Sequence, residues 1–178
     1  EKNAYCINSE LEYKIHNVLS RLTGLEGYFS YFATRRLIKK IKEFDPDVIH
    51  LRNLHGHYLN LPLFFKYLKK TQKPVVMHLH DCWILTGKCC HPTYHNCNGW
   101  LTECKNCPSR PEYPVSWLFD FSKMMFRHKK KWFDGLNKCI VVGVSDWIAG
   151  EGKKSYLGKF PVTRVYNWIN TDVFHPYE

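Results

Sequence analysis

Apolar residues along the chain alternate between helical spacing and short strand-like runs. Leu37, Ile38, Ile41 and Phe44 lie on one face of a predicted helix that Asp45-Pro46-Asp47 ends. The periodicity predicts helices over residues 33–44, 59–68 and 117–133. Buried strands are predicted at 48–51, 75–80, 139–144 and 161–166. Residues 1–30 show no period that assigns them.

This alternation of strands and helices predicts the α/β fold class, with a Rossmann-like parallel sheet and helices on both faces. We expect residues 1–178 to form one domain. Because the chain begins with a glutamate rather than methionine, we expect it to be a fragment of a longer protein. Residues 82–114 are polar, rich in cysteine and without a clear period, which predicts an irregular insertion.

Polar or aromatic side chains follow each predicted strand. Ligands of open parallel sheets gather at the carboxyl ends of the strands, so these residues are candidates for binding. They are His50, Arg52 and Asn53, then His80 and Asp81, then Ser145 and Trp147, and finally Asn167. Each has a structural alternative: Asp81 and Ser145 can cap a turn or helix, and His50 can be a core histidine.

Six of the eight cysteines lie between residues 82 and 107. The spacing Cys89-x7-Cys97-x6-Cys104-x2-Cys107 predicts a four-thiolate knuckle for structural zinc. An iron–sulfur cluster uses the same ligands and is the less favoured metal centre. Spare candidates are Cys82, Cys90, His91 and His95. Free cysteines or disulfides are the structural alternative, and Cys139 is expected to be a small buried apolar residue.

The formal charge of +10 favours acidic partners such as phosphorylated substrates, anionic lipid or nucleic acid. The basic residues gather in three runs, which are equally well explained as solvated helix faces. Trp117, Phe119, Phe121 and Phe126 precede Lys129-Lys130-Lys131, so an amphipathic helix resting on lipid is one interpretation and core packing is the other. No apolar run reaches the roughly 18 residues of a membrane span, and no leader is evident, which predicts a cytoplasmic protein.

Several motifs together resemble the amino-terminal domain of family-4 glycosyltransferases of the GT-B fold, especially bacterial capsule and exopolysaccharide enzymes. The resemblance covers about residues 30–176. Its specific part runs from Leu79-His80-Asp81-Cys82-Trp83 through Thr86-Gly87-Lys88-Cys89 to Cys104-Lys105-Asn106-Cys107-Pro108. Weaker matches are Asp45-Pro46-Asp47-Val48-Ile49-His50-Leu51, Asn53-Leu54-His55-Gly56, Pro74-Val75-Val76, Ser145-Asp146-Trp147 and Asn167-Trp168-Ile169-Asn170.

The resemblance implies a retaining transfer of a sugar from a nucleotide-sugar donor to a glycan or lipid-linked acceptor. It places His80 against the transferred sugar, with Asp81 beside it. It also implies a carboxy-terminal donor-binding domain, whose pair of glutamates separated by seven residues is not recognised here. This chain would then form one wall of the cleft and be inactive alone. Peripheral contact with the inner face of the membrane would suit a lipid-linked acceptor.

Two other functions compete with a glycosyltransferase. A zinc-containing nucleic-acid-binding module would explain the charge and the cysteines, and a non-catalytic interaction domain would need no reaction centre. The basic runs lie on separate predicted helices rather than in one stripe beside the cysteines. We therefore expect no nucleic-acid partner.

Overall fold

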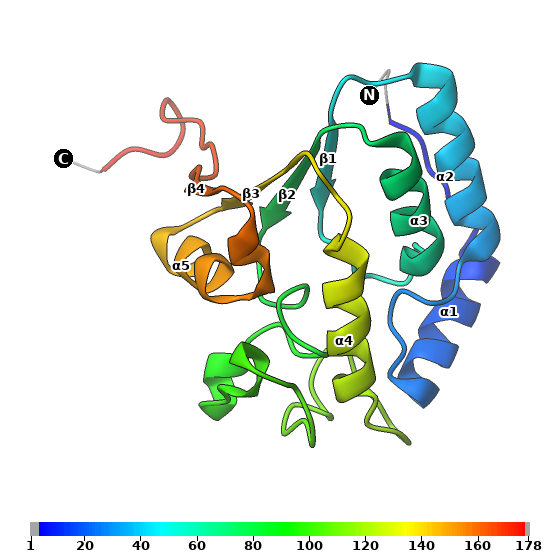
Figure 1. The fold of residues 1–178 in the computed structure, drawn as a ribbon, viewed down its shortest axis with the longest axis vertical. Coiled ribbons are helices and arrows are strands. Elements are labelled where there is room, and N and C mark those ends of the chain that lie inside the picture. Colours follow the sequence, from blue (N-terminus) through cyan, green and yellow to red (C-terminus); the bar gives the residue numbers. More distant parts are fainter. Residues whose placement is uncertain (1–3, 177–178) are drawn as a thin grey trace.

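The computed structural model of the protein describes residues 4–176. Within that range the helices are α1 (Glu10–Thr23), α2 (Tyr31–Phe44), α3 (Leu61–Thr71), α4 (Ser122–Phe133) and α5 (Asp146–Lys154). The strands are β1 (Ile49–Arg52), β2 (Val75–Leu79), β3 (Cys139–Gly143) and β4 (Val162–Arg164). Short 3-10 turns occupy Pro92–His95, Gly99–Leu101 and Tyr156–Lys159. Every predicted strand is present, and the predicted helices form with shifted ends (Figure 1).

The strands form one parallel sheet in the order β1-β2-β3-β4, which confirms the α/β class and the parallel sheet. In this order each crossover advances to the next strand, so right-handed crossovers all lie on the same face. The burial pattern agrees. Ile49, Met77 and Val141 alternate into the core, whereas His50 and Arg52 on the opposite face are exposed. We expected helices on both faces, but along β1 and β2 the described chain has one covered face.

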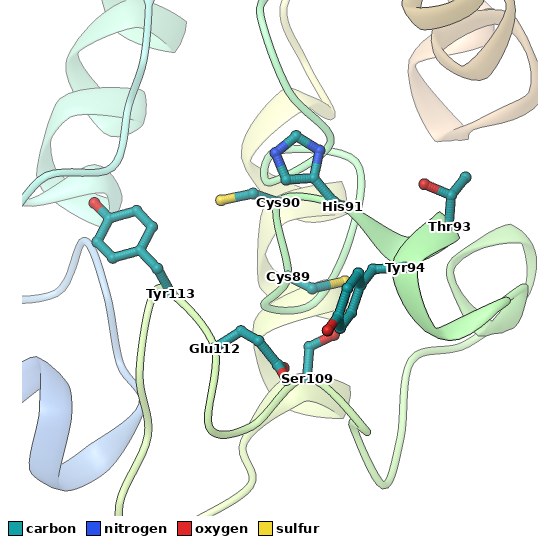
Figure 2. A pocket seen from close by; sticks show the side chains of 8 residues that line it. All are labelled: Cys89, Cys90, His91, Thr93, Tyr94, Ser109, Glu112 and Tyr113. Atoms are coloured by element: carbon teal, nitrogen blue, oxygen red, sulfur yellow. The ribbon is translucent and has the colours of Figure 1, made fainter.

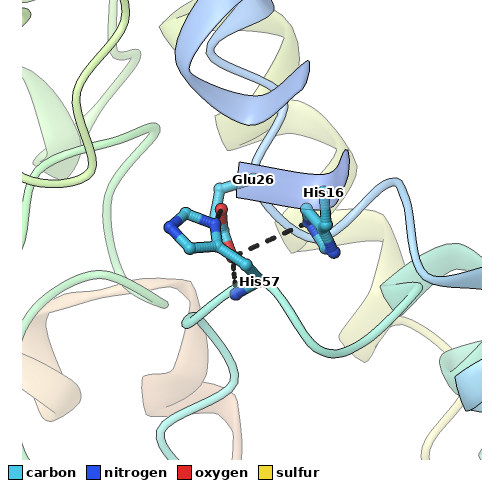
Figure 3. Close-up of side chains that lie close together, drawn as sticks. All are labelled: His16, Glu26 and His57. Atoms are coloured by element: carbon cyan, nitrogen blue, oxygen red, sulfur yellow. Dashed lines mark hydrogen bonds and ion pairs between the residues drawn. The ribbon is translucent and has the colours of Figure 1, made fainter. Parts of the chain in front are cut away.

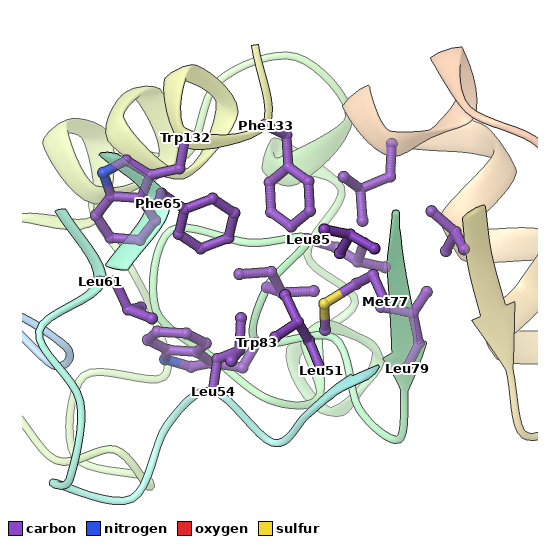
Figure 4. Close-up of a cluster of buried hydrophobic side chains, with 14 of the residues drawn as sticks. Leu51, Leu54, Leu61, Phe65, Met77, Leu79, Trp83, Leu85, Trp132 and Phe133 are labelled. Atoms are coloured by element: carbon purple, nitrogen blue, oxygen red, sulfur yellow. The ribbon is translucent and has the colours of Figure 1, made fainter. Parts of the chain in front are cut away.

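The core lies between the sheet and the helices α3 and α4. Phe65 of α3 stacks on Trp132 of α4, with ring centroids 5.7 Å apart, and also contacts Phe133. Trp83 and Leu85 of the cysteine-rich stretch belong to the same buried cluster (Figure 4). This stretch is therefore irregular in backbone but shares the core of the sheet.

Local capping explains several helix starts. Ser145 accepts a hydrogen bond from the backbone N–H of Ile148, so the predicted cap of α5 is confirmed. Ser9 and Glu12 form a reciprocal capping box at α1. The sequence missed α1 because that helix buries polar residues: its fully buried positions are His16 and Ser20 rather than an apolar stripe.

The helix predicted over 117–133 begins only at Ser122. Phe126 is buried, and Lys129 is completely buried, so both face the core. Trp117 and Phe119 precede the helix and are half exposed. The aromatics thus divide between core and surface, and the interpretation as a lipid-binding helix stays a prediction. Among the described residues, no helix is both long and apolar enough to cross a bilayer.

Candidate functional site

Four predicted or neighbouring side chains meet on the open face of the sheet at the ends of β1 and β2. The register pairs Arg52 with His78, which places the side chains of alternate residues on one face. His50 stacks on His78 with their ring nitrogens 3.2 Å apart. Arg52 Nε donates a hydrogen bond of 3.2 Å to His80 Nε2. His80 therefore has a fixed ring position at the carboxyl end of β2.

The surroundings of His80 favour its neutral form. Burial lowers its pKa below the usual value, and the positive charge of Arg52 lowers it further. Because Nε2 accepts the hydrogen bond from Arg52, the proton of the neutral ring lies on Nδ1. Nδ1–H is then free to donate a hydrogen bond to an oxygen of a ligand. Burial and the neighbouring His80 also lower the pKa of His78, to about 4.

The carboxylate of Asp81 pairs with groups other than the His80 ring. One of its oxygens, Oδ1, accepts the backbone N–H of Trp83 at 2.7 Å, as a turn cap does. The other, Oδ2, lies 2.8 Å from His55 Nε2. Burial alone would raise the pKa of Asp81, but the hydrogen bond with His55 and the other contacts lower it below its ordinary value. Asp81 is thus an ionised, half-buried carboxylate paired with His55.

The loop that carries His55 is anchored by a buried carboxylate. Glu26 accepts the backbone N–H groups of Gly56 and His57 at 3.0 and 2.8 Å, and the hydroxyl of Ser20 at 2.6 Å. His57 Nδ1 lies 2.6 Å from Glu26, and His16 lies 3.9 Å away on the opposite side (Figure 3). Hydrogen bonding and the two histidines hold the pKa of Glu26 at about 2 despite its burial. These contacts hold the loop after β1 in one conformation.

The remaining predicted binding residues lie on separate segments of the chain. Asn53 has a left-handed backbone, and its carbonyl accepts the hydroxyl of Tyr58. Ser145 acts as a helix cap, and Trp147 is 45% exposed in the first turn of α5. Asn167 is exposed in the segment after β4. The structure thus brings together His50, Arg52 and His80, whereas Asn53, Ser145, Trp147 and Asn167 stay predictions as binding residues.

The four cysteines of the predicted knuckle lie in one region without forming a compact ligand set. A hydrogen bond between Cys107 and Cys89 lowers the pKa of Cys89 and raises that of Cys107, and Cys104 Sγ accepts the backbone N–H of Gly87 at 3.1 Å. Two sets in the described chain have three potential ligand atoms within 4.8 Å of one another: His16, Glu26 and His57, and His55, Asp81 and Cys90. No three of the predicted cysteines meet that distance, so the zinc knuckle stays a prediction.

Two buried lysines surround these cysteines. Lys88 Nζ donates to the carbonyls of Ser109 and Glu112 at 3.0 and 3.1 Å and to that of Pro114. Lys129 Nζ donates to the carbonyls of Trp83 and Thr86 at 2.6 and 3.1 Å. Burial lowers the pKa of both ammonium groups, and nearby thiols would raise it when ionised. Such cations suit a region that holds thiolates.

Comparison with known proteins decides the family. The model of Glycosyltransferase Family 4 matches residues 7–173, which is nearly the whole described chain. The chain belongs to this family. It is also 38% identical over 74 residues to a protein of Escherichia coli (strain K12) named as a colanic acid biosynthesis glycosyl transferase, WcaC. That alignment covers 39% of this chain and 18% of the relative. No solved structure gives a significant match.

The chain is thus a family-4 glycosyltransferase domain that spans a small part of the length of the relative it matches. The residue that sequence reasoning passed over is His55, which joins Asp81 to Tyr113. Its signal was its place in Asn53-Leu54-His55-Gly56, directly after the first strand. Glu26 and Tyr113 lie in segments without periodicity, so no sequence pattern pointed to them.

Proposed function

We propose that the protein takes part in retaining transfer of a sugar from a nucleotide-sugar donor to a polysaccharide or lipid-linked acceptor. The observation that carries the proposal is the hydrogen bond from Arg52 to His80 at the carboxyl end of β2, in a domain of the glycosyltransferase family. This is the edge of a parallel sheet at which ligands bind. A second, donor-binding domain would supply the other wall of the cleft.

In this proposal His80 positions the reacting sugar and forms no covalent bond to it. Its Nδ1–H donates to a sugar hydroxyl, while Arg52 fixes the ring through Nε2. A neutral imidazole can do this without placing a positive charge beside the positive charge that develops on the transferred sugar. Holding the donor and the acceptor in a fixed orientation in a polar cleft is the main way in which a protein speeds such a reaction.

The test is His80→Ala in the full-length protein that contains this chain. We expect turnover to fall by about 10²-fold, the scale for losing one positioned polar group, with an almost unchanged melting temperature. Lys39→Ala, whose side chain is 79% exposed on α2, is the matched surface control and should keep full turnover. Normal turnover of His80→Ala would remove His80 from the mechanism. A collapsed melting temperature would mean that the ring is part of the core instead.

We also propose that Cys89, Cys97, Cys104 and Cys107 hold a structural zinc ion. Cys104 Sγ accepts a backbone N–H, Cys89 and Cys107 lie within hydrogen-bonding distance of each other, and Lys88 and Lys129 place positive charge near them. The ion would brace the irregular stretch beneath the sheet edge. Cys104→Ser should lose the zinc found by elemental analysis, whereas Cys6→Ser, at an exposed position, should retain it. Absence of both zinc and iron from the unchanged chain would refute a metal centre.

A peripheral contact with the cytoplasmic face of an anionic membrane is a further part of the proposal. Trp117, Leu118 and Phe119 are 52, 60 and 50% exposed in one run directly before α4. Lys123, Arg127, Lys130 and Lys131 line the neighbouring groove on that helix. Apolar side chains beside basic ones suit an anionic lipid surface. Replacing Trp117 and Phe119 with serine should reduce co-sedimentation with phosphatidylserine vesicles; unchanged co-sedimentation would exclude this surface.

A further inference from the structure

A cavity of about 460 Å³ lies within the cysteine-rich stretch. Its wall includes Cys90, Thr93, Tyr94, Glu112 and Tyr113, and Figure 2 shows Tyr94 and Tyr113 on opposite sides of it. The volume falls in the range of roughly 300–1,000 Å³ that is usual for small-molecule sites. The cavity also touches Cys89, a predicted zinc ligand, and Cys90 is a spare metal candidate. Thr93, Tyr94, Glu112 and Tyr113 were not predicted to bind a substrate or a metal, so the cavity adjoins the predicted metal site and adds residues of its own.

The wall of the cavity combines apolar surface with one unused acceptor. Tyr94 and Tyr113 are 76 and 48% exposed, so their rings are accessible to a ligand. Glu112 Oε1 lies 3.2 Å from His95 Nε2, whereas Oε2 is inaccessible to solvent and has no hydrogen-bond partner. An unpaired buried carboxylate oxygen is costly unless a donor reaches it. A rotation of the Glu112 side chain would turn this oxygen into the cavity, where a hydroxyl group of a ligand would supply that donor.

The cavity also has a direct link to the proposed reaction centre. The hydroxyl of Tyr113 lies 3.1 Å from His55 Nδ1, and His55 Nε2 lies 2.8 Å from Asp81. On the same side, Cys90 Sγ lies within 4.8 Å of the ligand atoms of both His55 and Asp81. Asp81 directly follows His80 in the sequence. The cavity wall is thus one side chain away from the carboxyl end of β2.

The wall is held in place before any ligand binds. Lys88 Nζ donates to the carbonyls of Ser109, Glu112 and Pro114, which fixes the segment that carries Glu112 and Tyr113. A preformed site loses less conformational entropy when a ligand binds. The cavity therefore differs from a surface depression whose shape depends on the motion of a loop.

We propose that this cavity binds a pyranose ring of the acceptor glycan, a role that rests on the proposed glycosyl transfer. A pyranose presents an apolar C–H face and a rim of hydroxyl groups. The C–H face would pack on Tyr113 or Tyr94, and a hydroxyl would donate to Glu112 Oε2. The glycan would extend from there past His55 and Asp81 towards His80. The cysteine-rich stretch is then a substrate-binding element as well as a brace.

The experiment titrates the isotope-labelled chain with the methyl glycosides of glucose, galactose, mannose and N-acetylglucosamine and follows its amide NMR signals. At least one glycoside should shift the signals of Thr93, Glu112 and Tyr113. Glu112→Gln should weaken its binding about tenfold, because a hydrogen bond to a charged acceptor is stronger than one to a neutral acceptor. Tyr94→Ala, at an exposed position that tolerates truncation, should weaken binding as well.

Glu103→Gln is the matched control, since Glu103 lies in the same stretch but pairs outward with Lys123 and Arg127. The proposal would be overturned by shifts confined to other parts of the chain or by no shift with any of the glycosides. It would also be overturned if Glu112→Gln and Tyr94→Ala bound the glycoside as tightly as the unchanged chain does. The titration needs no donor and no turnover. The titration can therefore fail while His80→Ala still lowers turnover, and it can succeed when that variant keeps normal turnover.

Discussion

The ammonium nitrogen of Lys129 lies 3.3 Å from the centre of the Trp83 ring. The lysine is completely buried, and its two other contacts are the carbonyls of Trp83 and Thr86. A cation in this position gains from the face of the indole and from two hydrogen bonds, which together offset part of its desolvation. It connects α4 to the start of the cysteine-rich stretch.

Lys129→Ala should therefore lower the free energy of unfolding by about 3 kcal/mol, because it leaves a cavity and two buried carbonyls without donors. Lys130→Ala changes an exposed side chain one position along and should remain within about 0.5 kcal/mol of the unchanged chain. Chemical denaturation followed by tryptophan fluorescence measures both. Equal stability of the two variants would show that the contact with Trp83 contributes nothing.

A second prediction concerns the close packing of β3 against α5. A Cβ added at Gly143 would lie 2.6 Å from the backbone nitrogen of Ala149, which cannot move independently of the helix. Gly143→Ala should cost about 2 kcal/mol of stability. At Gly150, on the same helix, an added Cβ meets nothing within 4 Å. Gly150→Ala should instead stabilise the chain by about 1 kcal/mol, and thermal unfolding should show the opposite signs.

The buried polar cluster around Glu26 should make stability depend on pH. Burial lowers the pKa of His16 from 6.5 to about 4, so the unfolded chain binds a proton before the folded chain does. The free energy of unfolding should therefore decrease by about 3 kcal/mol as the pH falls from 6.5 to 4. Glu26, with its pKa lowered from 4.5 to about 2, adds a loss that begins below pH 4.5.

His16→Gln should flatten the upper part of that profile, between pH 6.5 and 4. His91→Gln replaces an exposed histidine and should leave the profile unaltered. Urea denaturation at a series of pH values gives both curves. If the two variants lose stability in parallel with the unchanged chain, another group is responsible for the dependence.

The contact between Arg52 and His80 predicts a change that needs no activity assay. The guanidinium lowers the pKa of His80, after burial, so Arg52→Met should raise that pKa towards its ordinary value. Histidine NMR signals followed through a pH titration report this directly. Arg127→Met, which removes a charge that pairs with Glu103 instead, should not move the titration of His80. An unmoved titration in Arg52→Met would mean that the contact does not form in solution.

Most of the sheet could be predicted from the sequence because its strands are short apolar runs with strong local signals. The helix α1 could not, since its buried side chains are His16 and Ser20, which satisfy polar contacts rather than an apolar stripe. Lys129 shows the same difficulty. A lysine in a basic run indicates a solvated face, yet its neighbours Met125 and Phe126 bury the helix at that position.

The candidate site divides in a similar way. Their places at the carboxyl ends of predicted strands identified His50, Arg52 and His80, because these ends of parallel strands share one edge. The partner of Asp81 could not be found in this way. His55 reaches it from a different loop, whose path depends on Glu26, and Tyr113 arrives from a segment far along the chain. Such pairings are set by tertiary packing and leave no local pattern.

The hydrogen bonds from two backbone N–H groups to Glu26 link the stability of the loop after β1 to that of a distant segment. The amides of Gly56 and His57 are bonded to a side chain 30 and 31 residues earlier in the sequence. Their exchange with solvent hydrogen requires that this carboxylate withdraws, which in turn disturbs its contacts with Ser20 and His16 on α1. Opening of the loop that presents His55 to Asp81 is therefore coupled to the contacts that Glu26 makes with α1.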